Sequence, residues 1–182
     1  MFDTVLIANR GAIACRIIRT LKRLGIRAVA VYTRADHGSR HVQEADEALW
    51  IGEGVAAESY LNIERILEAA RLSGAQAIHP GYGFLSENAA FALACEQEGL
   101  AFIGPTPAQI ECFGLKHTAR ELARANAAPL LPGTELLETV AAAQAAAETI
   151  GYPVMLKSTA GGGGIGMRLC HTPVDLESSF AS

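Results

Sequence analysis

Short apolar runs alternate with amphipathic stretches over the first hundred residues of the chain. The run at 2–8 is rich in β-branched residues, and apolar positions then recur at helical spacing from Ile13 to Leu24. The same alternation predicts strands at 2–8, 26–32, 48–51, 77–79 and 101–103, and helices at 13–24, 63–72 and 88–98. Strands that alternate with helices in this way indicate an α/β fold with a Rossmann-like parallel sheet covered by helices.

The pattern changes after residue 105. Helices are predicted at 108–113, 116–125 and 140–150, and a strand at 154–157 is followed by a glycine run and a returning strand at 167–171. We place a domain boundary near Phe113, which gives domains 1–112 and 113–182. The last residues read as the start of another helix, so we expect the sheet that begins at Val154 to be incomplete at Ser182.

Composition narrows the classes of function. The 182 residues are 50% hydrophobic and 19% charged, which is typical of a globular chain, and a net charge of -4 gives no basic footprint for nucleic acid. No apolar run has the length of a membrane span and no signal peptide is evident, so we expect a cytoplasmic protein without nucleic-acid or membrane partners. The four cysteines are scattered, so we expect reduced and mostly buried thiols.

The glycine run is the first candidate for chemistry. Residues 161–166 fit G-x-G-x-x-G, but strands flank the run on both sides, whereas a dinucleotide fingerprint requires a helix after it. A Walker A loop is excluded because the lysine, Lys157, lies upstream. We therefore interpret the run as a hairpin that covers nucleotide phosphates and rank a plain surface turn behind it. Lys157 ends an apolar strand, so we expect it to be partly buried and to need an anionic partner.

Four motifs, in this order, resemble the biotin carboxylase family over nearly the whole chain. They are IANRG at 7–11, HPGYGFLSEN at 79–88, FIGP at 102–105, and Lys157 with its glycine loop. HPGYGFLSEN is highly specific. The segments LKHTAR at 115–120 and MLKSTA at 155–160 further resemble the urea carboxylase branch, the carboxylase part of urea amidolyase.

The resemblance implies a pre-ATP-grasp domain followed by the beginning of an ATP-grasp domain with a glycine-rich β-hairpin. It also implies a ligase reaction, in which ATP phosphorylates bicarbonate to carboxyphosphate and the CO2 equivalent is captured by a ureido nitrogen of biotin. Biotin would sit on a biotin carboxyl carrier domain, and a carboxyltransferase domain would pass the carboxyl group to urea, giving allophanate.

The resemblance also assigns site residues. Lys116 and Lys157 would contact ATP phosphates or nearby adenosine atoms, and Tyr82, Gly83 and Glu87 would border the biotin and bicarbonate side of the cleft. The loop that would close over the triphosphate is made by Gly161, Gly162, Gly163 and Gly164. The Mg²⁺ ligands, the general base and the arginines for bicarbonate and the ureido oxygen are expected after Ser182. We therefore expect no catalytic or metal-binding residue within this chain, and little or no activity from it alone.

Simpler interpretations compete with these roles. Without the resemblance, Lys116 reads as an ordinary exposed residue, and Glu87 is as well explained as a cap of the helix near Asn88. His79 is better read as a satisfied core histidine than as a catalytic one. His37 and His41 have a helical spacing, but no third metal ligand is evident.

The first predicted helix carries a basic cluster. A solvated polar face is the default interpretation, and the alternative, implied by the resemblance, is a homodimer interface. The cluster is formed by Arg16, Arg19, Lys22 and Arg23.

Two other functions remain open. The chain could be part of another ATP-grasp ligase, such as a carbamoyl phosphate or purine-pathway enzyme, against which HPGYGFLSEN argues. It could also be a non-catalytic remnant that keeps only assembly contacts and has no affinity for nucleotide.

Overall fold

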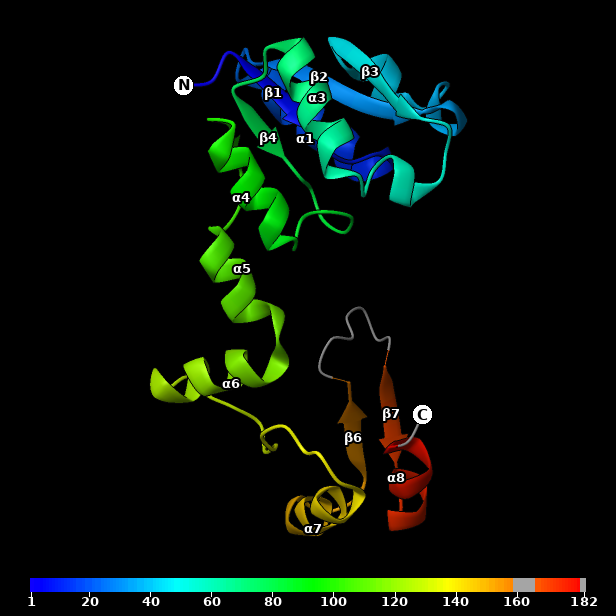
Figure 1. The fold of residues 1–182 in the computed structure, drawn as a ribbon, viewed down its shortest axis with the longest axis vertical. Coiled ribbons are helices and arrows are strands. Elements are labelled where there is room, and N and C mark those ends of the chain that lie inside the picture. Colours follow the sequence, from blue (N-terminus) through cyan, green and yellow to red (C-terminus); the bar gives the residue numbers. More distant parts are fainter. Residues whose placement is uncertain (159–165, 181–182) are drawn as a thin grey trace. The chain divides into compact units, whose positions relative to one another are not determined.

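The computed structural model describes residues 1–158 and 166–180 (Figure 1). The chain divides into two compact units, Met1–Ile110 and Glu111–Ser182. Each unit has its own apolar core and is described by itself below.

The first unit is built on a five-stranded sheet in the order β3-β2-β1-β4-β5. Every neighbouring pair is parallel, which confirms the predicted α/β class. The chain leaves β1 toward β2 on one side and later returns to β4 on the other. The strands are β1 (Thr4–Ile7), β2 (Arg27–Thr33), β3 (Glu47–Gly52), β4 (Ala77–His79) and β5 (Ala101–Phe102).

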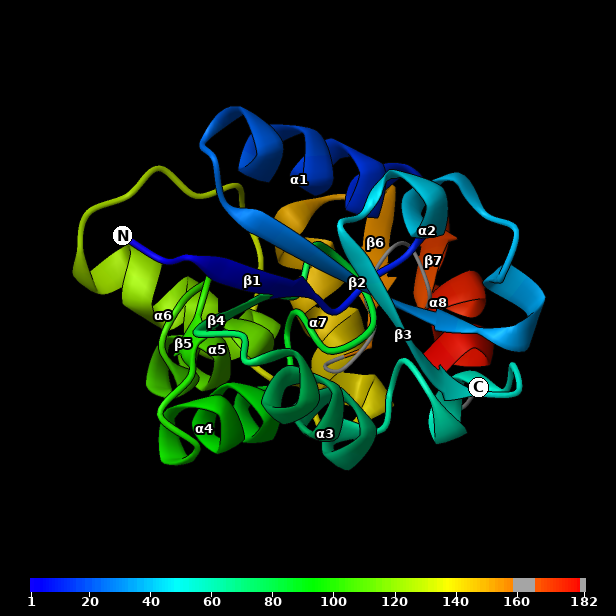
Figure 2. The same ribbon diagram turned by 90° about the horizontal axis from the view of Figure 1, so that it is seen from above.

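Helices cover both faces of this sheet. Figure 2 shows α1 on one face, with α3 and α4 on the other. Short helical segments that were not predicted follow β2 and β3. The helices are α1 (Gly11–Arg23), η1 (Arg34–Asp36), α2 (Arg40–Glu44), η2 (Ala56–Glu58), α3 (Ile63–Ser73), α4 (Ala89–Gln97) and α5 (Pro107–Gly114).

Alternation along β1 divides the core in two. Val5 and Ile7 pack toward α1, where Ile18 is fully buried. Leu6, between them, points to the opposite face and joins the cluster that contains Phe91 of α4. Because β1 is buried on both faces, it reads in the sequence as an uninterrupted apolar run.

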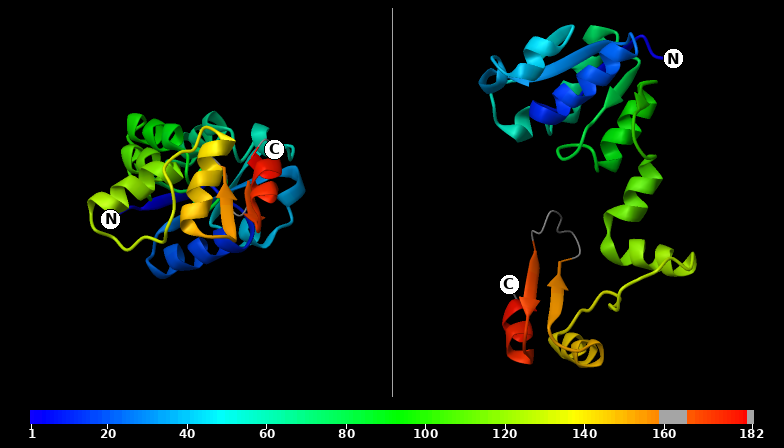
Figure 3. Two further views of the ribbon diagram at one scale, coloured as in Figure 1. Left: turned by 90° about the horizontal axis from the view of Figure 1, so that it is seen from below. Right: turned by 180° about the vertical axis from the view of Figure 1, so that it is seen from behind.

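The second unit is an antiparallel hairpin with helices. β6 (Val154–Lys157) pairs with β7 (Met167–Cys170), in a register that places Lys157 opposite Met167. A small core forms between α7 (Val140–Ile150), α8 (Pro173–Phe180) and one face of the hairpin. Figure 3 shows α7 and α8 beside the hairpin, and α6 (Lys116–Ala125) precedes them in the chain. The strands predicted on either side of the glycine run are thereby confirmed.

Two predictions from composition can be compared with the fold. Cys15, Cys95 and Cys170 are buried free thiols and Cys112 is half-buried, as expected. Burial raises the pKa of Cys95 to about 12, which keeps that thiol protonated. In the part of the chain that the structure describes, no helix is both long and apolar enough to cross a bilayer.

Candidate functional site

A hollow opens at the carboxyl edge of the first sheet. Its volume is about 440 Å³, and residues 9–13, which follow β1, line it together with residues 82–84, which follow β4. The two strands are neighbours, and the connections from them run to opposite sides of the sheet. Open α/β sheets bind ligands at such a topological switch point. Tyr82 and Gly83, two of the predicted biotin-side residues, therefore lie where this fold class places a ligand.

The loop after β4, residues 80–88, is held at two places. At its start, the Gly81 N–H donates to Nδ1 of His79 at 3.1 Å, and Asn9 contacts the loop from the turn after β1. At its middle, the ring of Phe84 stacks on Tyr60, with ring centroids 4.9 Å apart and planes 17° from parallel. Between these supports, Tyr82 is 67% exposed and borders the hollow.

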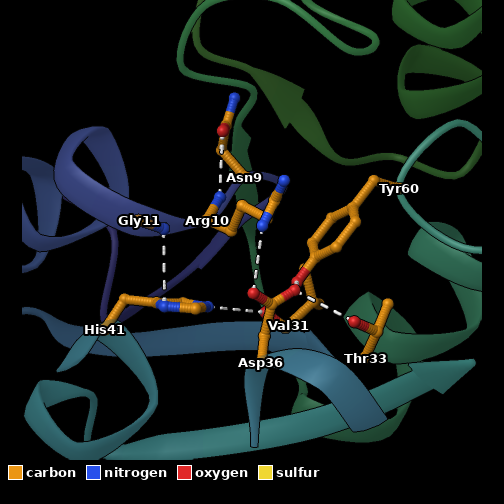
Figure 4. Close-up of polar contacts among 8 residues, drawn as sticks. All are labelled: Asn9, Arg10, Gly11, Val31, Thr33, Asp36, His41 and Tyr60. Atoms are coloured by element: carbon orange, nitrogen blue, oxygen red, sulfur yellow. Dashed lines mark hydrogen bonds and ion pairs between the residues drawn. The ribbon is translucent and has the colours of Figure 1, made fainter. Parts of the chain in front are cut away.

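A buried carboxylate organises the turn that follows β1. Asp36 accepts hydrogen bonds from the hydroxyls of Thr33 and Tyr60, both at 2.9 Å, and from the Arg10 guanidinium at 3.1 Å (Figure 4). The Arg10 guanidinium also lies 5.8 Å from the centre of the Tyr60 ring, within cation–π range. Asp36 thus ties Arg10, at the rim of the hollow, to Tyr60, which supports Phe84.

Burial and hydrogen bonding compete at this carboxylate. Burial alone would raise the pKa of Asp36, but the hydrogen bonds from Tyr60 and Thr33 and the charge of Arg10 outweigh it and lower the pKa. The pKa of Tyr60 is raised, chiefly by burial and then by its bond to Asp36. The pair is therefore a carboxylate that accepts from a neutral phenol.

His41 fixes the beginning of α1. The imidazole is fully buried, and burial lowers its pKa, so the neutral ring is favoured. The Gly11 N–H donates to Nδ1 at 3.4 Å, and Nε2 lies 3.3 Å from the Val31 carbonyl, to which it donates in that tautomer (Figure 4). The ring thus joins β2 to the helix start that lines the hollow.

Residue 81 must be glycine because a side chain there would collide with Asn9, and this predicts how alanine substitutions in the loop affect stability. Its φ is +68°, and a Cβ there would lie 2.8 Å from Nδ2 of Asn9, whereas a Cβ at Gly83, with φ +70°, would meet nothing within 4 Å. We expect Gly83→Ala to cost about 1–2 kcal/mol of unfolding free energy, from backbone strain. Gly81→Ala should cost about 1–3 kcal/mol more, from overpacking.

Urea unfolding followed by the fluorescence of Trp50, the one tryptophan of the chain, measures both variants. Equal losses for the two alanines would show that Asn9 does not crowd residue 81.

In the second unit, α6 contacts the end of β6. The Lys116 ammonium donates to the Ser158 carbonyl at 3.1 Å, and the Ser158 N–H donates to the Gly166 carbonyl at 2.8 Å. Lys116 therefore lies at the exit of the strand that carries Lys157, because its partner Ser158 directly follows Lys157 in sequence. The four glycines Gly161, Gly162, Gly163 and Gly164 lie outside the described residues.

The prediction that Lys157 is partly buried is wrong. Lys157 is exposed, because the hairpin packs only one of its faces on α7 and α8. Val154 and Leu156 take that face, so Met155 and Lys157 fall on the other one.

Other predictions from single residues have clear outcomes. Glu87 is exposed and does not cap α4; the cap is the side chain of Asn88, which accepts from the Phe91 N–H at 2.9 Å. Among the described residues, those that line the hollow do not include Glu87. His79 is half-buried and accepts from Gly81, as expected for a satisfied histidine, and burial lowers its pKa.

The basic side chains of α1, Arg16, Arg19, Lys22 and Arg23, are all exposed, as a solvated face requires.

Among the polar residues that build the turn, Asp36 and Tyr60 have no signal in the sequence, and His41 stands out there only as a possible metal ligand. Asp36, His41 and Tyr60 come from three separate segments, and none belongs to a recognised motif. Within residues 1–158 and 166–180, no group of three or more His, Cys, Asp or Glu side chains is placed to hold a metal ion.

Comparison with known proteins identifies the family of this chain. Residues 1–110 match the family described as "Biotin carboxylase, N-terminal domain", and residues 116–182 match "Carbamoyl-phosphate synthase L chain, ATP binding domain". The chain is 52% identical to urea amidolyase of Saccharomyces cerevisiae over 180 residues, 99% of this chain and 10% of that protein. It is also 52% identical to the biotin carboxylase of Halalkalibacterium halodurans, over 100% of this chain and 40% of that one.

A solved structure is similarly close. The biotin carboxylase domain dimer of Hydrogenobacter thermophilus 2-oxoglutarate carboxylase, in complex with MgADP, ADP and bicarbonate, aligns with a TM-score of 0.94 and 48% identity, covering 100% of this chain and 40% of that one. The first unit is an open, parallel α/β sheet with a hollow at its topological switch point, which places it in the doubly wound α/β class. The chain belongs to the biotin carboxylase N-terminal domain family. It spans from 10% to about 40% of the length of these relatives.

Proposed function

We propose that residues 1–182 are the amino-terminal part of a biotin carboxylase, which uses ATP and bicarbonate to carboxylate biotin. The observation that carries the proposal is the family match over residues 1–110, the unit that contains the hollow and the loop of Tyr82 and Gly83. In this reaction a bicarbonate oxygen attacks the γ-phosphorus of ATP and ADP leaves. The resulting carboxyphosphate splits into phosphate and CO2, and a ureido nitrogen of biotin adds to the CO2 and loses its proton.

The second unit supplies the proposed nucleotide side. The match of residues 116–182 to an ATP-binding domain supports this assignment. Lys157 would offset the charge that accumulates on the transferring phosphoryl group, and Lys116 would help to hold the nucleotide. The glycines Gly161 to Gly164 would cover the triphosphate with backbone N–H groups.

The first unit would border the carboxyl acceptor. Tyr82 and Gly83 would lie beside biotin, with Glu87 near them on the same loop. Biotin would arrive on a carrier domain. The biotin carboxylase domain of Hydrogenobacter thermophilus 2-oxoglutarate carboxylase is a dimer, and by analogy the exposed basic face of α1 would serve a homodimer contact. The segments at 115–120 and 155–160 favour urea as the final acceptor, through a carboxyltransferase domain that would yield allophanate.

The test is ATP cleavage by the complete product of the reading frame that encodes these residues. We expect the full rate to require both bicarbonate and free biotin, with carboxybiotin formed as ATP is consumed. Addition of urea should then give ATP-dependent consumption of urea. The 182-residue chain alone should show little or no cleavage. Cleavage by the complete product that does not depend on bicarbonate would contradict the proposal and favour another ATP-grasp ligase.

A further inference from the structure

Asn9 is a buried amide that contacts the acceptor-side loop directly. It is 3% exposed, and its Nδ2 donates to the Pro80 carbonyl at 2.7 Å and to the Tyr82 carbonyl at 2.8 Å. Its Oδ1 accepts from the Arg10 N–H at 2.9 Å (Figure 4). Both amide hydrogens and the oxygen are therefore used. The two hydrogens connect the turn after β1 to the loop after β4, and the oxygen binds within the turn.

The chemistry at this position requires an asparagine. Two carbonyls face the Nδ2 atom and one N–H faces the Oδ1 atom, so the side chain must donate twice and accept once. An aspartate of the same shape only accepts when it is ionised, and would direct an oxygen at two carbonyls. The Asn9 side chain also fills the space that a Cβ of Gly81 would need.

The contact fixes one peptide plane in particular. In a trans peptide the C=O and the following N–H point in opposite directions. Because the Tyr82 carbonyl points at Asn9, the Gly83 N–H points away from Asn9. The orientation of the peptide between Tyr82 and Gly83, the two loop residues proposed to lie beside biotin, therefore depends on one side chain outside the loop.

We infer that Asn9 is a positioning residue for the carboxyl acceptor, which it serves by orienting the Tyr82–Gly83 peptide. The inference rests on the proposed function. The stacking of Phe84 on Tyr60 holds the loop on the carboxyl side of that peptide, and Asn9 holds it at the peptide itself and at Pro80. Loss of Asn9 releases one of these two supports and leaves the other in place.

The experiment compares Asn9→Asp with Asn62→Asp. Asn62 caps α3 by accepting from the Arg65 N–H at 3.1 Å, a role that aspartate keeps, so the control adds the same charge without losing a contact. In the complete reading-frame product, we expect Asn9→Asp to lower kcat/KM for free biotin by about tenfold or more. The KM for Mg-ATP should stay within about twofold, and Asn62→Asp should change neither constant.

Hydrogen exchange on the 182-residue chain gives a readout independent of activity. The amide hydrogens of residues 81–86 should exchange at least about tenfold faster in Asn9→Asp than in Asn62→Asp. Asn9→Ser, which removes the amide without adding charge, should show the same increase and replaces Asn9→Asp if the aspartate variant does not fold.

The outcomes separate the two claims. A wild-type enzyme that does not depend on biotin overturns the proposed function, and the acceptor role with it. If the wild type depends on biotin, the proposed function stands and the inference alone is tested. It is overturned if Asn9→Asp behaves like Asn62→Asp, or if Asn9→Asp changes the kinetic constants for biotin and for Mg-ATP in the same proportion.

Discussion

Replacing Asp36 by alanine is expected to lower the unfolding free energy by about 3 kcal/mol. The change leaves the buried hydroxyls of Tyr60 and Thr33 without their acceptor, and a buried polar group that loses its partner costs about 1–3 kcal/mol. It also removes the partner of the Arg10 guanidinium. Urea unfolding followed by Trp50 fluorescence measures the loss. Glu53→Ala, which breaks the exposed pair with Arg34, is the control and should cost less than about 1 kcal/mol.

The pH dependence of Asp36 has a definite sign. Its pKa is lower in the folded protein than in the unfolded chain, so its contribution is fully present above the unfolded value, about 3.9, and is lost as pH falls through the folded value. The stability difference between the wild type and Asp36→Asn should therefore be constant near neutral pH and shrink below about pH 4. A difference that grows in acid would contradict the assignment of Asp36 as an ionised acceptor.

Replacing Lys157 by alanine is expected to weaken the binding of Mg-ATP to the complete reading-frame product by about tenfold to hundredfold. This follows if the ammonium makes a charge-assisted contact with phosphate, which is worth about 1.5–3 kcal/mol. Isothermal titration calorimetry gives the dissociation constant.

Arg168→Ala is the matched control for Lys157→Ala. Arg168 of β7 lies opposite Leu156 of β6, so its side chain belongs to the face of the hairpin opposite to that of Lys157, and it is also an exposed cation. Its loss should change the dissociation constant by less than about twofold. Equal effects of the two alanines would indicate general charge attraction, without a specific contact from Lys157.

Regular elements could be predicted from the sequence because local patterns determine them. The predicted bounds of β4, α6, α7 and β6 agree with the structure residue by residue. In α7, eight good helix formers precede Gly151 and Pro153, which end the helix. Parallel strands buried on both faces are similarly evident as apolar runs.

The polar framework of the site could not be predicted in the same way. The helices η1 and α2 span three and five residues, too few to show a helical period, and they carry Asp36 and His41. Tyr60 meets Asp36 across 24 residues of sequence, a contact that no local pattern encodes. Lys157 was misplaced for a related reason, because an apolar strand does not reveal which of its faces is packed.

Transfer of oxygen from bicarbonate to phosphate tests the central claim most directly. The complete reading-frame product would be supplied with ATP, biotin and bicarbonate labelled with heavy oxygen, and the released phosphate analysed by mass spectrometry. Attack of a bicarbonate oxygen on the γ-phosphorus predicts one labelled oxygen in each phosphate released. Unlabelled phosphate would show that water attacks ATP, and would contradict the assignment of this chain to an enzyme that activates bicarbonate.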